Sequence, residues 1–343
     1  MSLRDAIAAA VEGRDLPTGQ VEAAFGEIMD GRASPVQIAA LLVALRTKGE
    51  SVDEIVAAAR ALRARAERAP LVDPRTVDTC GTGGDGANTF NISTTAAFVV
   101  AGAGVPVAKH GNRAASSKAG SFDVLEALGV VIDLPIAVCA AILADVGIAP
   151  FFARTAHPAM RHVAPVRREL GIRTLMNMLG PLLNPVGARH QLVGVPSLAW
   201  TRTIAEALGR LGARRALVVH GRDGLDELTT TGPSHVVMTT AGVSTEFEVD
   251  PAGLGIALAR PEDLAGGDAA HNAEIARAVL AGEGGPRRDI VVLNAGAALL
   301  AAEAVEDLAA GCEAARRSLD SGAAGAKLEA LVEATRAATR EVG

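Results

Sequence analysis

Glycine, hydroxyl and amide residues are concentrated in one short stretch of this chain, TCGTGGDGANTFNIST at residues 79–94. Gly81, Gly83 and Gly84 carry no side chains, so their N–H groups can approach a ligand closely and form an anion-binding turn. A helix is predicted to begin soon afterwards, near Ser93, and a helix N-terminus also favours phosphate. A tight strand-to-helix turn would explain the same glycines equally well. Because the stretch has neither the Gly-Lys-Ser/Thr ending of a P-loop nor GxGxxG spacing, ATPases and dinucleotide-binding proteins are disfavoured.

A second, cationic stretch at residues 109–113, KHGNR, is followed by Ser116, Ser117 and Lys118. It comes directly after a short apolar run at 105–108 that predicts a buried strand. Ligands of open α/β sheets bind at the carboxyl ends of the strands. The stretch therefore predicts a second phosphate loop, and a solvated surface loop is the alternative. Two phosphate loops would together accept a ligand with two separated phosphate groups.

An adjacent pair of carboxylates, Asp226 and Glu227, follows another predicted strand at 216–220. Mg²⁺ prefers a few carboxylates together with substrate phosphates and waters. For the pair alone, an exposed acidic turn is the alternative. In combination with two phosphate loops, the pair favours a magnesium site.

Arg167 lies in a basic stretch, HPAMRHVAPVRRE at residues 157–169. A guanidinium fork binds carboxylates in a bidentate manner, so an arginine in a cleft suits a substrate carboxylate. Taken alone, most arginines are surface residues, and a single histidine such as His157 is more often structural than catalytic.

The predicted secondary structure that positions these residues changes near residue 70, from helices alone to alternating strands and helices. Residues 1–69 predict helices only, with capping boxes that begin at Ser34 and Ser51. Downstream, strands and helices alternate, which predicts an α/β fold with a mainly parallel sheet covered on both faces. Strands are predicted at 105–108, 130–132, 216–220, 236–238 and 246–249, the last two as a possible hairpin. Helices are predicted at 94–102, 121–128, 135–145, 198–211, 271–282 and 294–317. Gly, Pro and Asn interrupt this pattern at 170–190, where a chain crossing between domains would leave a cleft.

The composition narrows the classes of function. The 343-residue chain has a net charge of −6 and only 2% aromatic residues, which disfavours a nucleic-acid surface built from basic and stacking side chains. Its three cysteines, Cys80, Cys139 and Cys312, are far apart, so neither a disulfide framework nor a cysteine metal motif is expected.

No membrane segment is expected either. The apolar stretch near 94–108 is too short to span a bilayer. The charged N-terminal segment predicts an amphipathic helix and no signal peptide, so a cytoplasmic protein without a membrane partner is expected.

Four stretches together resemble the anthranilate phosphoribosyltransferase family of tryptophan biosynthesis: DTCGTGGDGANTFNIST, AKHGNRAASSKAGSFDVLEALG, HPAMRHVAPVRRELGIRTLMNMLGPLLNP and DGLDELTTTGP. They occur in the family's order and spacing, and the resemblance covers nearly the whole chain. It implies a helical domain at 1–70 with a contribution from 170–190, and an α/β domain made of 71–169 and 191–343. It also implies the substrates phosphoribosyl pyrophosphate (PRPP) and anthranilate, the cofactor Mg²⁺, and a homodimer formed through the helical domains.

The resemblance further implies roles for individual residues. Mg²⁺ would be associated with Ser93, Asp226 and Glu227, and catalysis would depend chiefly on Lys109 and Arg167. Anthranilate would meet Gly81, Asn112, Arg167, His110 and His157. PRPP would be contacted by Gly81, Gly84, Asp85, Thr89, Asn91, Ile92, Ser93, Thr94, Lys109, His110, Gly111, Asn112, Arg113, Ala114, Ala115, Ser116, Ser117 and Ser121. Three residues depart from the family pattern, Arg154, Ala156 and Pro196, and these would alter the shape of the anthranilate entrance.

The implied reaction is attack of the anthranilate amine on C1 of PRPP with loss of pyrophosphate, through an oxocarbenium-like state similar to that of glycoside cleavage. Two other functions are compatible with a related scaffold. A pyrimidine-nucleoside phosphorylase would bind free phosphate and a nucleoside, but the Lys-x-Ser-x-x-Arg base-binding pattern of that family is missing from the sequence. A non-catalytic relative that binds nucleic acid is opposed by the acidic balance of the chain.

Overall fold

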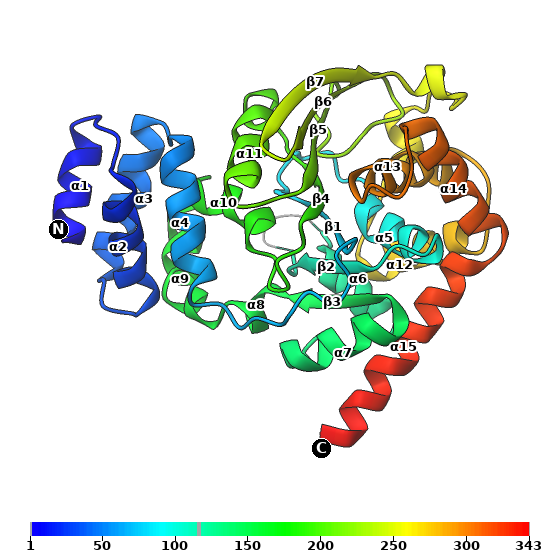
Figure 1. The fold of residues 1–343 in the computed structure, drawn as a ribbon, viewed down its shortest axis with the longest axis horizontal. Coiled ribbons are helices and arrows are strands. Elements are labelled where there is room, and N and C mark those ends of the chain that lie inside the picture. Colours follow the sequence, from blue (N-terminus) through cyan, green and yellow to red (C-terminus); the bar gives the residue numbers. More distant parts are fainter. Residues whose placement is uncertain (1, 115–117, 343) are drawn as a thin grey trace.

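The computed structural model describes residues 2–114 and 118–342. The chain begins with a helical unit, on the left in Figure 1, made of α1 (Leu3–Val11), α2 (Thr18–Met29), α3 (Pro35–Lys48) and α4 (Val52–Arg63). The predicted capping boxes begin α3 and α4, where the hydroxyls of Ser34 and Ser51 accept hydrogen bonds from the N–H groups of Gln37 and Glu54. Within the described ranges, no helix has the length and hydropathy needed to cross a membrane.

A seven-stranded sheet forms the centre of the remaining chain, in the order β3-β2-β1-β4-β5-β6-β7 (Figure 1). Its strands are β1 (Val77–Gly81), β2 (Val107–Gly111), β3 (Ile148–Phe152), β4 (His190–Gly194), β5 (Arg215–Gly221), β6 (Ser234–Thr240) and β7 (Val243–Val249). The five strands from β3 to β5 are parallel, and β6 and β7 are antiparallel additions. The mainly parallel sheet is therefore as predicted, and the predicted hairpin is β6-β7.

Helices cover both faces of this sheet. The α-helices are α5 (Ile92–Gly102), α6 (Ser121–Ala127), α7 (Ile136–Val146), α8 (Ala153–Ala156), α9 (Ala164–Leu170), α10 (Leu175–Leu179), α11 (Leu198–Arg210), α12 (Ala269–Leu280), α13 (Pro286–Ala301), α14 (Leu308–Asp320) and α15 (Ala323–Val342). Four short 3-10 helices join them: η1 (Pro158–His162), η2 (Gly180–Leu183), η3 (Pro251–Leu254) and η4 (Pro261–Leu264).

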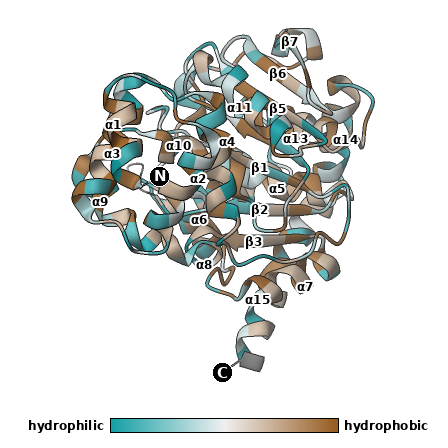
Figure 2. Cartoon of the chain, turned by 60° about the vertical axis from the view of Figure 1, so that its left-hand side comes forward, coloured by the Kyte–Doolittle hydropathy of each residue, from teal (hydrophilic) through white to brown (hydrophobic). Residues whose placement is uncertain are grey.

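Side chains that alternate along the strands divide the interior into two apolar clusters. Leu192 and Leu217 lie in one cluster with residues of α5 and α13, whereas Val193 and Val218 lie in the other with residues of α4, α10 and α11. Successive residues of a strand point to opposite faces, so each cluster is the core beneath one face of the sheet. The second cluster also contains the helices of the N-terminal unit, which packs against α10 and α11 on that side of the sheet. In Figure 2, hydrophobic (brown) segments occur along β3 and α7.

One predicted strand is wrong, and three strands were not predicted. Residues 130–132 form no strand, although Val130 and Ile132 are buried. The N–H of Val131 donates to the hydroxyl of Thr335 in α15 instead of to a neighbouring strand. Short apolar runs do not by themselves distinguish a buried strand from another buried segment. The strands that complete the sheet are β1, β3 and β4, which the sequence pattern did not reveal.

The predicted helix at 294–317 is also wrong, because it consists of two helices. α13 ends at Ala301 and α14 begins at Leu308. Between them Glu303 has a φ of +56°, and the Asp307 side chain caps α14 by accepting a hydrogen bond from the N–H of Ala310. Alanine-rich sequence continues through the break, so helix propensity alone does not mark it.

The carboxyl ends of β1 and β4 form the topological switch point of the sheet. From β1 the chain runs to β2 and β3 on one side, and it then returns to β4 and β5 on the other. In open α/β sheets, the loops that diverge at such a point leave a crevice for ligands. Gly81 and Gly194 are paired at these strand ends. The stretches predicted to bind phosphate and metal follow β1, β2 and β5, so they all begin at this edge.

Candidate active site

The glycine loop at residues 82–91 leaves the carboxyl end of β1. Three of its glycines, Gly83, Gly84 and Gly86, have φ values of +67°, +86° and +73°. Left-handed conformations of this kind disfavour residues with a Cβ atom, so the glycines permit the repeated turns of the backbone. Two of the residues predicted to contact PRPP, Asp85 and Thr89, are half-buried in this loop.

The helix after the loop begins slightly earlier than predicted. α5 starts at Ile92, with Asn91 in the N-cap position and no side-chain cap. Ser93 and Thr94 therefore lie inside its first turn and do not cap it. The hydroxyl of Thr94 is buried and has no partner within the described ranges. The N–H groups of Ile92 and Ser93 already donate to Phe90 and Glu227, so within the described ranges the unused donor of a side chain in this turn is the Thr94 hydroxyl, which suits an anionic ligand at the helix N-terminus.

The acidic pair is joined directly to this loop. The Oδ2 atom of Asp226 accepts a hydrogen bond of 2.8 Å from the N–H of Gly83. The Oε1 atom of Glu227 accepts one of 3.1 Å from the N–H of Ser93. Residues more than 130 positions apart in the sequence therefore meet at the two ends of the glycine loop, as the predicted magnesium and phosphate site requires.

The electrostatics of this acidic pair favour a cation. Burial, together with the charges of Asp85 and Glu227, raises the pKa of Asp226 well above its usual value. Burial also raises the pKa of Glu227 to about 7, although the charge of Lys109 opposes the rise. A carboxylate pair whose ionised form is disfavoured in this way is stabilised by any cation that joins it.

The donor set suits Mg²⁺ held mainly by its substrate. Three side chains meet here with oxygen ligands only, those of Ser93, Asp226 and Glu227. No group of three or more acidic, histidine or cysteine side chains in metal-binding geometry occurs in the described ranges. Mg²⁺ commonly takes one or two carboxylates plus phosphate and water oxygens, so the residues present fit that ion.

Lys109 and His110 lie in a strand and not in the loop that the sequence predicts. β2 runs from Val107 to Gly111, two to three residues later than the predicted strand. It is paired residue by residue with β3, with Lys109 opposite Pro150 and His110 opposite Phe151. Because β3 was not predicted, the sequence pattern could not show where β2 ends.

Lys109 is 3% exposed, and its side chain reaches from β2 to β1, the strand that leads into the glycine loop. Its Nζ atom donates to the carbonyl oxygen of Thr79 at 2.5 Å. Burial lowers the pKa of Lys109, although the charges of Asp78, Cys80 and Glu227 oppose that shift. The lysine therefore contributes a positive charge at the floor of the site, close to the acidic pair.

The second loop, at 112–120, is closed by Asp123 of α6. The Oδ2 atom of Asp123 accepts hydrogen bonds of 2.8 Å from the N–H groups of both Ala114 and Gly120. Ser121 donates its hydroxyl proton to the carbonyl oxygen of Asn112. Arg113 forms an ion pair with Glu126 at 2.8 Å, so this predicted PRPP ligand already has an acidic partner. The predicted ligands Ala115, Ser116 and Ser117 lie outside the described residues.

Asn91 connects the two predicted phosphate loops. Its amide nitrogen donates to the carbonyl oxygen of Ala119 in the second loop at 3.4 Å. Its amide oxygen accepts a hydrogen bond of 2.9 Å from Asn272 of α12. Asn272 was not singled out from the sequence, because nothing near it resembles a ligand-binding motif. It acts on the site by orienting Asn91.

His110 and His157 form a buried pair. Their rings meet edge to face with centroids 5.3 Å apart, and the Nε2 atom of His157 contacts the carbonyl oxygen of Leu183 at 3.0 Å. Burial lowers the pKa of His110 to about 3 and that of His157 to about 4. Both rings are therefore neutral at physiological pH. One nitrogen of each ring, Nε2 of His110 and Nδ1 of His157, has no partner in the described part of the chain.

Arg167 lies on α9 and is half-buried. Burial lowers the pKa of its guanidinium, and no acidic group acts on it. Within the described ranges it makes no side-chain hydrogen bond or ion pair, in contrast to most arginines of the protein. A desolvated guanidinium without a counter-ion is suited to an anionic ligand.

Arg173 is a residue of the site that the sequence pattern did not identify. Its guanidinium donates to the carbonyl oxygens of Gly84 and Gly83, at 3.0 and 2.9 Å, and its Cζ atom lies 4.9 Å from the ring centroid of Trp200. The signal available in the sequence was its place in the Gly- and Pro-rich interruption at 170–190. Arg173 links that segment to the glycine loop.

Asn184 is a second unpredicted residue of the same segment. Its amide nitrogen donates to the Oδ2 atom of Asp78 in β1 and to the carbonyl oxygen of Ala108 in β2, both at 2.9 Å. Asp78 also accepts the N–H of His110, and burial raises the pKa of Asp78 to about 6. Asn184 therefore ties the crossing segment to the two strands that carry Lys109 and the glycine loop.

The departures from the family pattern are close to these groups. Ala156 is fully buried directly before His157, whereas Arg154 is exposed and Pro196 is half-buried.

Comparisons with known proteins identify the family. The glycosyl transferase a/b domain matches residues 73–325, and the glycosyl transferase helical bundle domain matches residues 4–66. The anthranilate phosphoribosyltransferase of Moorella thermoacetica is 55% identical over 330 residues, which cover 96% of this chain and 97% of that protein. The crystal structure of the Thermus thermophilus enzyme of the same name matches with a TM-score of 0.92 at 46% identity, covering 97% of this chain and 99% of that one.

A more distant enzyme of this name, from Saccharomyces cerevisiae, was solved in complex with PRPP and Mg. It matches with a TM-score of 0.90 at 26% identity and covers 98% of both chains. The same yeast enzyme was also solved with 4-fluoroanthranilate. Since the relatives match this chain over nearly its whole length and share up to 55% of its residues, the chain belongs to the anthranilate phosphoribosyltransferase family.

Proposed function

We propose that this chain transfers the 5-phosphoribosyl group of PRPP to the amine of anthranilate, giving N-(5-phosphoribosyl)anthranilate and pyrophosphate in the second step of the tryptophan branch. The observation that carries this proposal is the junction of the acidic pair with the glycine loop, through Gly83 to Asp226 and Ser93 to Glu227. This junction sets oxygen ligands for Mg²⁺ beside backbone donors for phosphate, as a magnesium–diphosphate substrate requires. Relatives that share more than half of the residues bear the name of this activity.

In this proposal Mg²⁺ is held by Asp226 and Glu227, with Ser93 beside them. When bound, the ion neutralises charge that develops on the departing pyrophosphate. The N–H groups of Gly83 and Ser93 are engaged by the two carboxylates, so the remaining N–H groups of the glycine loop and the hydroxyl of Thr94 bind the diphosphate oxygens in this proposal. Lys109, which reaches from β2 to β1, adds a fixed positive charge on the same side.

Anthranilate is oriented by its carboxylate in this proposal. Arg167 has no acidic partner of its own, so it is free to form a bidentate pair with that group. His110 and His157, both neutral, line the approach without competing for the carboxylate as cations. Asn112, which is exposed at the end of β2, supplies a polar contact.

The reaction forms the bond between the anthranilate nitrogen and C1 of the ribose and breaks the bond between C1 and the pyrophosphate oxygen. The nitrogen loses one proton after the attack. An aromatic amine is a weak nucleophile, so acceleration depends on stabilising the leaving group and holding the two substrates in register. Orientation of this kind can contribute about 7–11 kcal/mol.

The activity is tested by incubating the purified protein with PRPP, Mg²⁺ and anthranilate and following the loss of anthranilate fluorescence. We expect turnover that requires all three components. Thymidine and uridine with phosphate serve as the competing substrates. Phosphorolysis of either nucleoside without transfer to anthranilate would establish the phosphorylase alternative, and binding to DNA without any turnover would establish the nucleic-acid alternative.

Replacing Arg167 by Ala should raise the KM for anthranilate. A charge-assisted hydrogen bond contributes about 1.5–3 kcal/mol, so we expect an increase of roughly tenfold to a hundredfold, with a much smaller change in the KM for PRPP. Arg168→Ala is the matched control, because Arg168 is the next residue on α9 and is exposed. Steady-state kinetics with each substrate varied in turn measure the effect. An Arg167→Ala effect confined to the KM for PRPP would refute the assignment.

Replacing Arg173 by Gln should weaken PRPP binding. The variant loses the guanidinium fork that holds the carbonyl oxygens of Gly83 and Gly84, so the glycine loop becomes less ordered before the substrate arrives. We expect the KM for PRPP to rise about tenfold, equivalent to ~1.4 kcal/mol, while the KM for anthranilate changes little. Arg161→Gln, an exposed site on η1, is the control. Equal PRPP kinetics in the two variants would exclude a loop-ordering role for Arg173.

We also propose a homodimer formed through the helical unit. Val11 and Val36, on α1 and α3, are 71% and 77% exposed, and Val43 on α3 is 36% exposed. Exposed apolar residues gathered on adjoining helices indicate an interaction surface. Light scattering should report a dimer for the unmodified protein and a monomer for Val11→Asp combined with Val36→Asp. Val243→Asp, at an equally exposed site on β7, should remain a dimer. A monomeric unmodified protein would contradict the proposal.

We also propose the division of the chain into two domains. The helical domain consists of 1–70 with 170–190, and the α/β domain consists of 71–169 with 191–343. The helix-only content of residues 3–63 supports the first boundary, whereas the apolar cluster of the N-terminal helices also contains Val193, Ile204 and Val218 and so joins the two units. A cytoplasmic location also stays a prediction, and the three cysteines, all free thiols, are compatible with it.

A further inference from the structure

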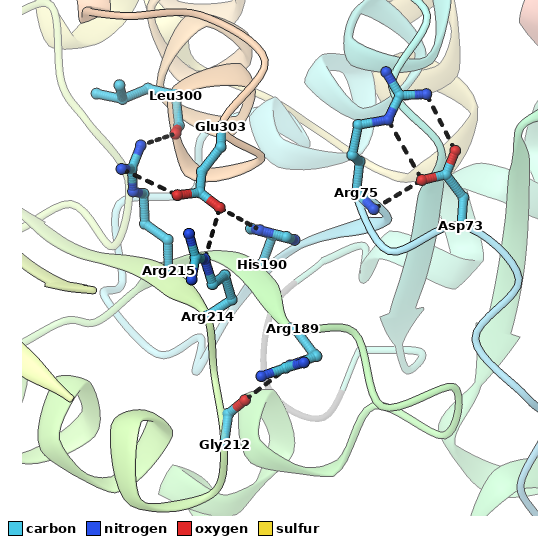
Figure 3. Close-up of polar contacts among 9 residues, drawn as sticks. All are labelled: Asp73, Arg75, Arg189, His190, Gly212, Arg214, Arg215, Leu300 and Glu303. Atoms are coloured by element: carbon cyan, nitrogen blue, oxygen red, sulfur yellow. Dashed lines mark hydrogen bonds and ion pairs between the residues drawn. The ribbon is translucent and has the colours of Figure 1, made fainter. Parts of the chain in front are cut away.

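A basic cavity lies at the opposite edge of the sheet from the glycine loop, and Figure 3 shows the polar side chains around it. It is lined by Pro74, Arg75, Arg189, His190, Arg214, Ala302 and Glu303 and has a volume of about 250 Å³. Arg75 precedes β1, His190 begins β4, and Arg214 directly precedes β5. The cavity is therefore formed at the amino ends of three parallel strands, whereas the candidate active site lies at their carboxyl ends.

Positive charge exceeds negative charge around this cavity. Four arginines, at positions 75, 189, 214 and 215, are gathered with only two carboxylates, those of Asp73 and Glu303 (Figure 3). Burial lowers the pKa of His190, so the imidazole adds no charge near neutral pH. The cavity thus carries a surplus of two positive charges in a chain whose net charge is −6.

Several donors at the cavity are not used within the protein. Arg189 donates through Nε to the carbonyl oxygen of Gly212 at 3.3 Å, and its two terminal nitrogens have no hydrogen bond in the described part of the chain. Arg214 uses only Nε, at 3.0 Å from Glu303. The neutral His190 ring donates from Nε2 to Glu303, so its Nδ1 atom is an acceptor and adds no donor to the cavity. Guanidinium terminal nitrogens are the donors that bind oxyanions in a bidentate manner.

Capping the C-terminal end of α13 explains only some of the basic side chains around the cavity. Arg215 does serve that end, because it donates to the carbonyl oxygen of Leu300 at 3.2 Å and pairs with Glu303 at 3.3 Å. Glu303 has a φ of +56°, a conformation that is uncommon for a residue other than glycine. The contacts of this carboxylate with His190, Arg214 and Arg215 hold the cluster together. Among the described residues, no acidic group pairs with Arg189 or with the terminal nitrogens of Arg214.

We propose that this cavity binds a phosphate group, at a site separate from the two phosphate loops of the reaction. A doubly charged tetrahedral oxyanion would neutralise the surplus charge and accept hydrogen bonds from Arg189 and Arg214. The group could be supplied as inorganic phosphate or as a phosphate monoester. The proposal does not depend on the identity of the substrates, because it uses no residue of the candidate active site.

Equilibrium dialysis with radiolabelled inorganic phosphate tests the proposal by counting phosphates per chain. The experiment compares the unmodified protein, the double variant Arg189→Ser with Arg214→Ser, and the control Arg317→Ser. Arg317 is an exposed arginine on α14. The double variant should bind one phosphate fewer per chain at saturation, and the control should bind as many as the unmodified protein. Transferase kinetics, measured separately, should be the same in all three. An equal number of bound phosphates in the double variant would overturn the proposal. The single variant Arg189→Ser, which removes an exposed side chain, provides the same readout if the double variant folds poorly.

The source of the phosphate group is distinguished by repeating the dialysis in the presence of phenyl phosphate. Competition at the site lost in the double variant shows that a monoester is accepted, and lack of competition shows that the site takes free phosphate. Crystals soaked in tungstate provide a positional check, because the anomalous signal should lie between Arg189 and Arg214. Signal confined to the glycine loop would contradict the proposal.

Discussion

Neutralising the acidic pair by Asp226→Asn combined with Glu227→Gln should reduce kcat by at least a hundredfold without destabilising the fold. The loss follows because the two carboxylates hold Mg²⁺ in the proposed mechanism, and a bound metal can contribute several kcal/mol to stabilising the transition state. A hundredfold loss corresponds to only ~2.7 kcal/mol. The amide substitutes keep oxygen acceptors for the N–H groups of Gly83 and Ser93. Removing two charges that burial disfavours should leave the melting temperature unchanged or higher.

The control for this variant removes the same number of charges elsewhere. Glu262→Gln with Asp263→Asn changes an adjacent acidic pair on η4, where Asp263 pairs with Arg260 on the surface. Both double variants are compared by Mg²⁺ titration of kcat and by thermal unfolding of the metal-free protein. An unchanged Mg²⁺ dependence in Asp226→Asn with Glu227→Gln would reject the metal site. A large fall in melting temperature would instead assign the pair a structural role.

The second large effect is expected from Gly194→Ala. Gly194 is the last residue of β4, and a Cβ atom there would lie 1.5 Å from the carbonyl oxygen of Asp226 and 2.5 Å from its carbonyl carbon. A backbone obstacle cannot rotate away, so either β4 or the segment that carries the acidic pair must move. Overpacking of this kind typically costs about 1–3 kcal/mol of stability. Displacement of catalytic groups by about 1 Å can cost roughly a hundredfold in rate, and we expect kcat to fall by that amount.

Gly232→Ala is the matched control, because it lies in the loop after the acidic pair and a Cβ atom there meets nothing within 4 Å. Its kcat and melting temperature should equal those of the unmodified protein. Circular dichroism and thermal unfolding separate a local displacement from loss of the fold. If Gly194→Ala retained full activity and stability, the packing of the Asp226 backbone on β4 would not determine the position of the acidic pair.

The phosphate and metal stretches were accessible to sequence reasoning because each is local. The glycine-rich stretch must turn sharply wherever it occurs, since Gly83, Gly84 and Gly86 can adopt positive φ at little cost. The pair Asp226 and Glu227 follows a strand that its run of apolar residues makes evident. The rule that ligands bind at the carboxyl ends of strands was enough to expect the acidic pair at a ligand site, although the strand before the glycine stretch was not predicted.

Lys109 shows why other assignments failed. Its position inside β2 depends on pairing with β3, and β3 begins only at Ile148. The residues around Lys109 give no indication that β3 pairs with them, so the strand that is β2 was predicted to end too early. The run at 130–132 failed for the opposite reason, because its apolar residues pack as a loop against α15 without pairing. A buried segment consists of apolar residues whether or not it hydrogen-bonds to a neighbouring strand.

The sequence by itself determined the helical unit, the alternation that makes a parallel sheet, the glycine loop and the acidic pair. These depend on hydrophobic periodicity, caps and backbone freedom, which act over a few residues. The tertiary structure alone decided that Arg173 holds the glycine loop, that Asn272 orients Asn91, and that Glu303 gathers three basic residues at the opposite edge. Those contacts join residues that are from 88 positions (Arg215 and Glu303) to 181 positions (Asn91 and Asn272) apart. They depend on strand order and register, which local sequence patterns do not contain.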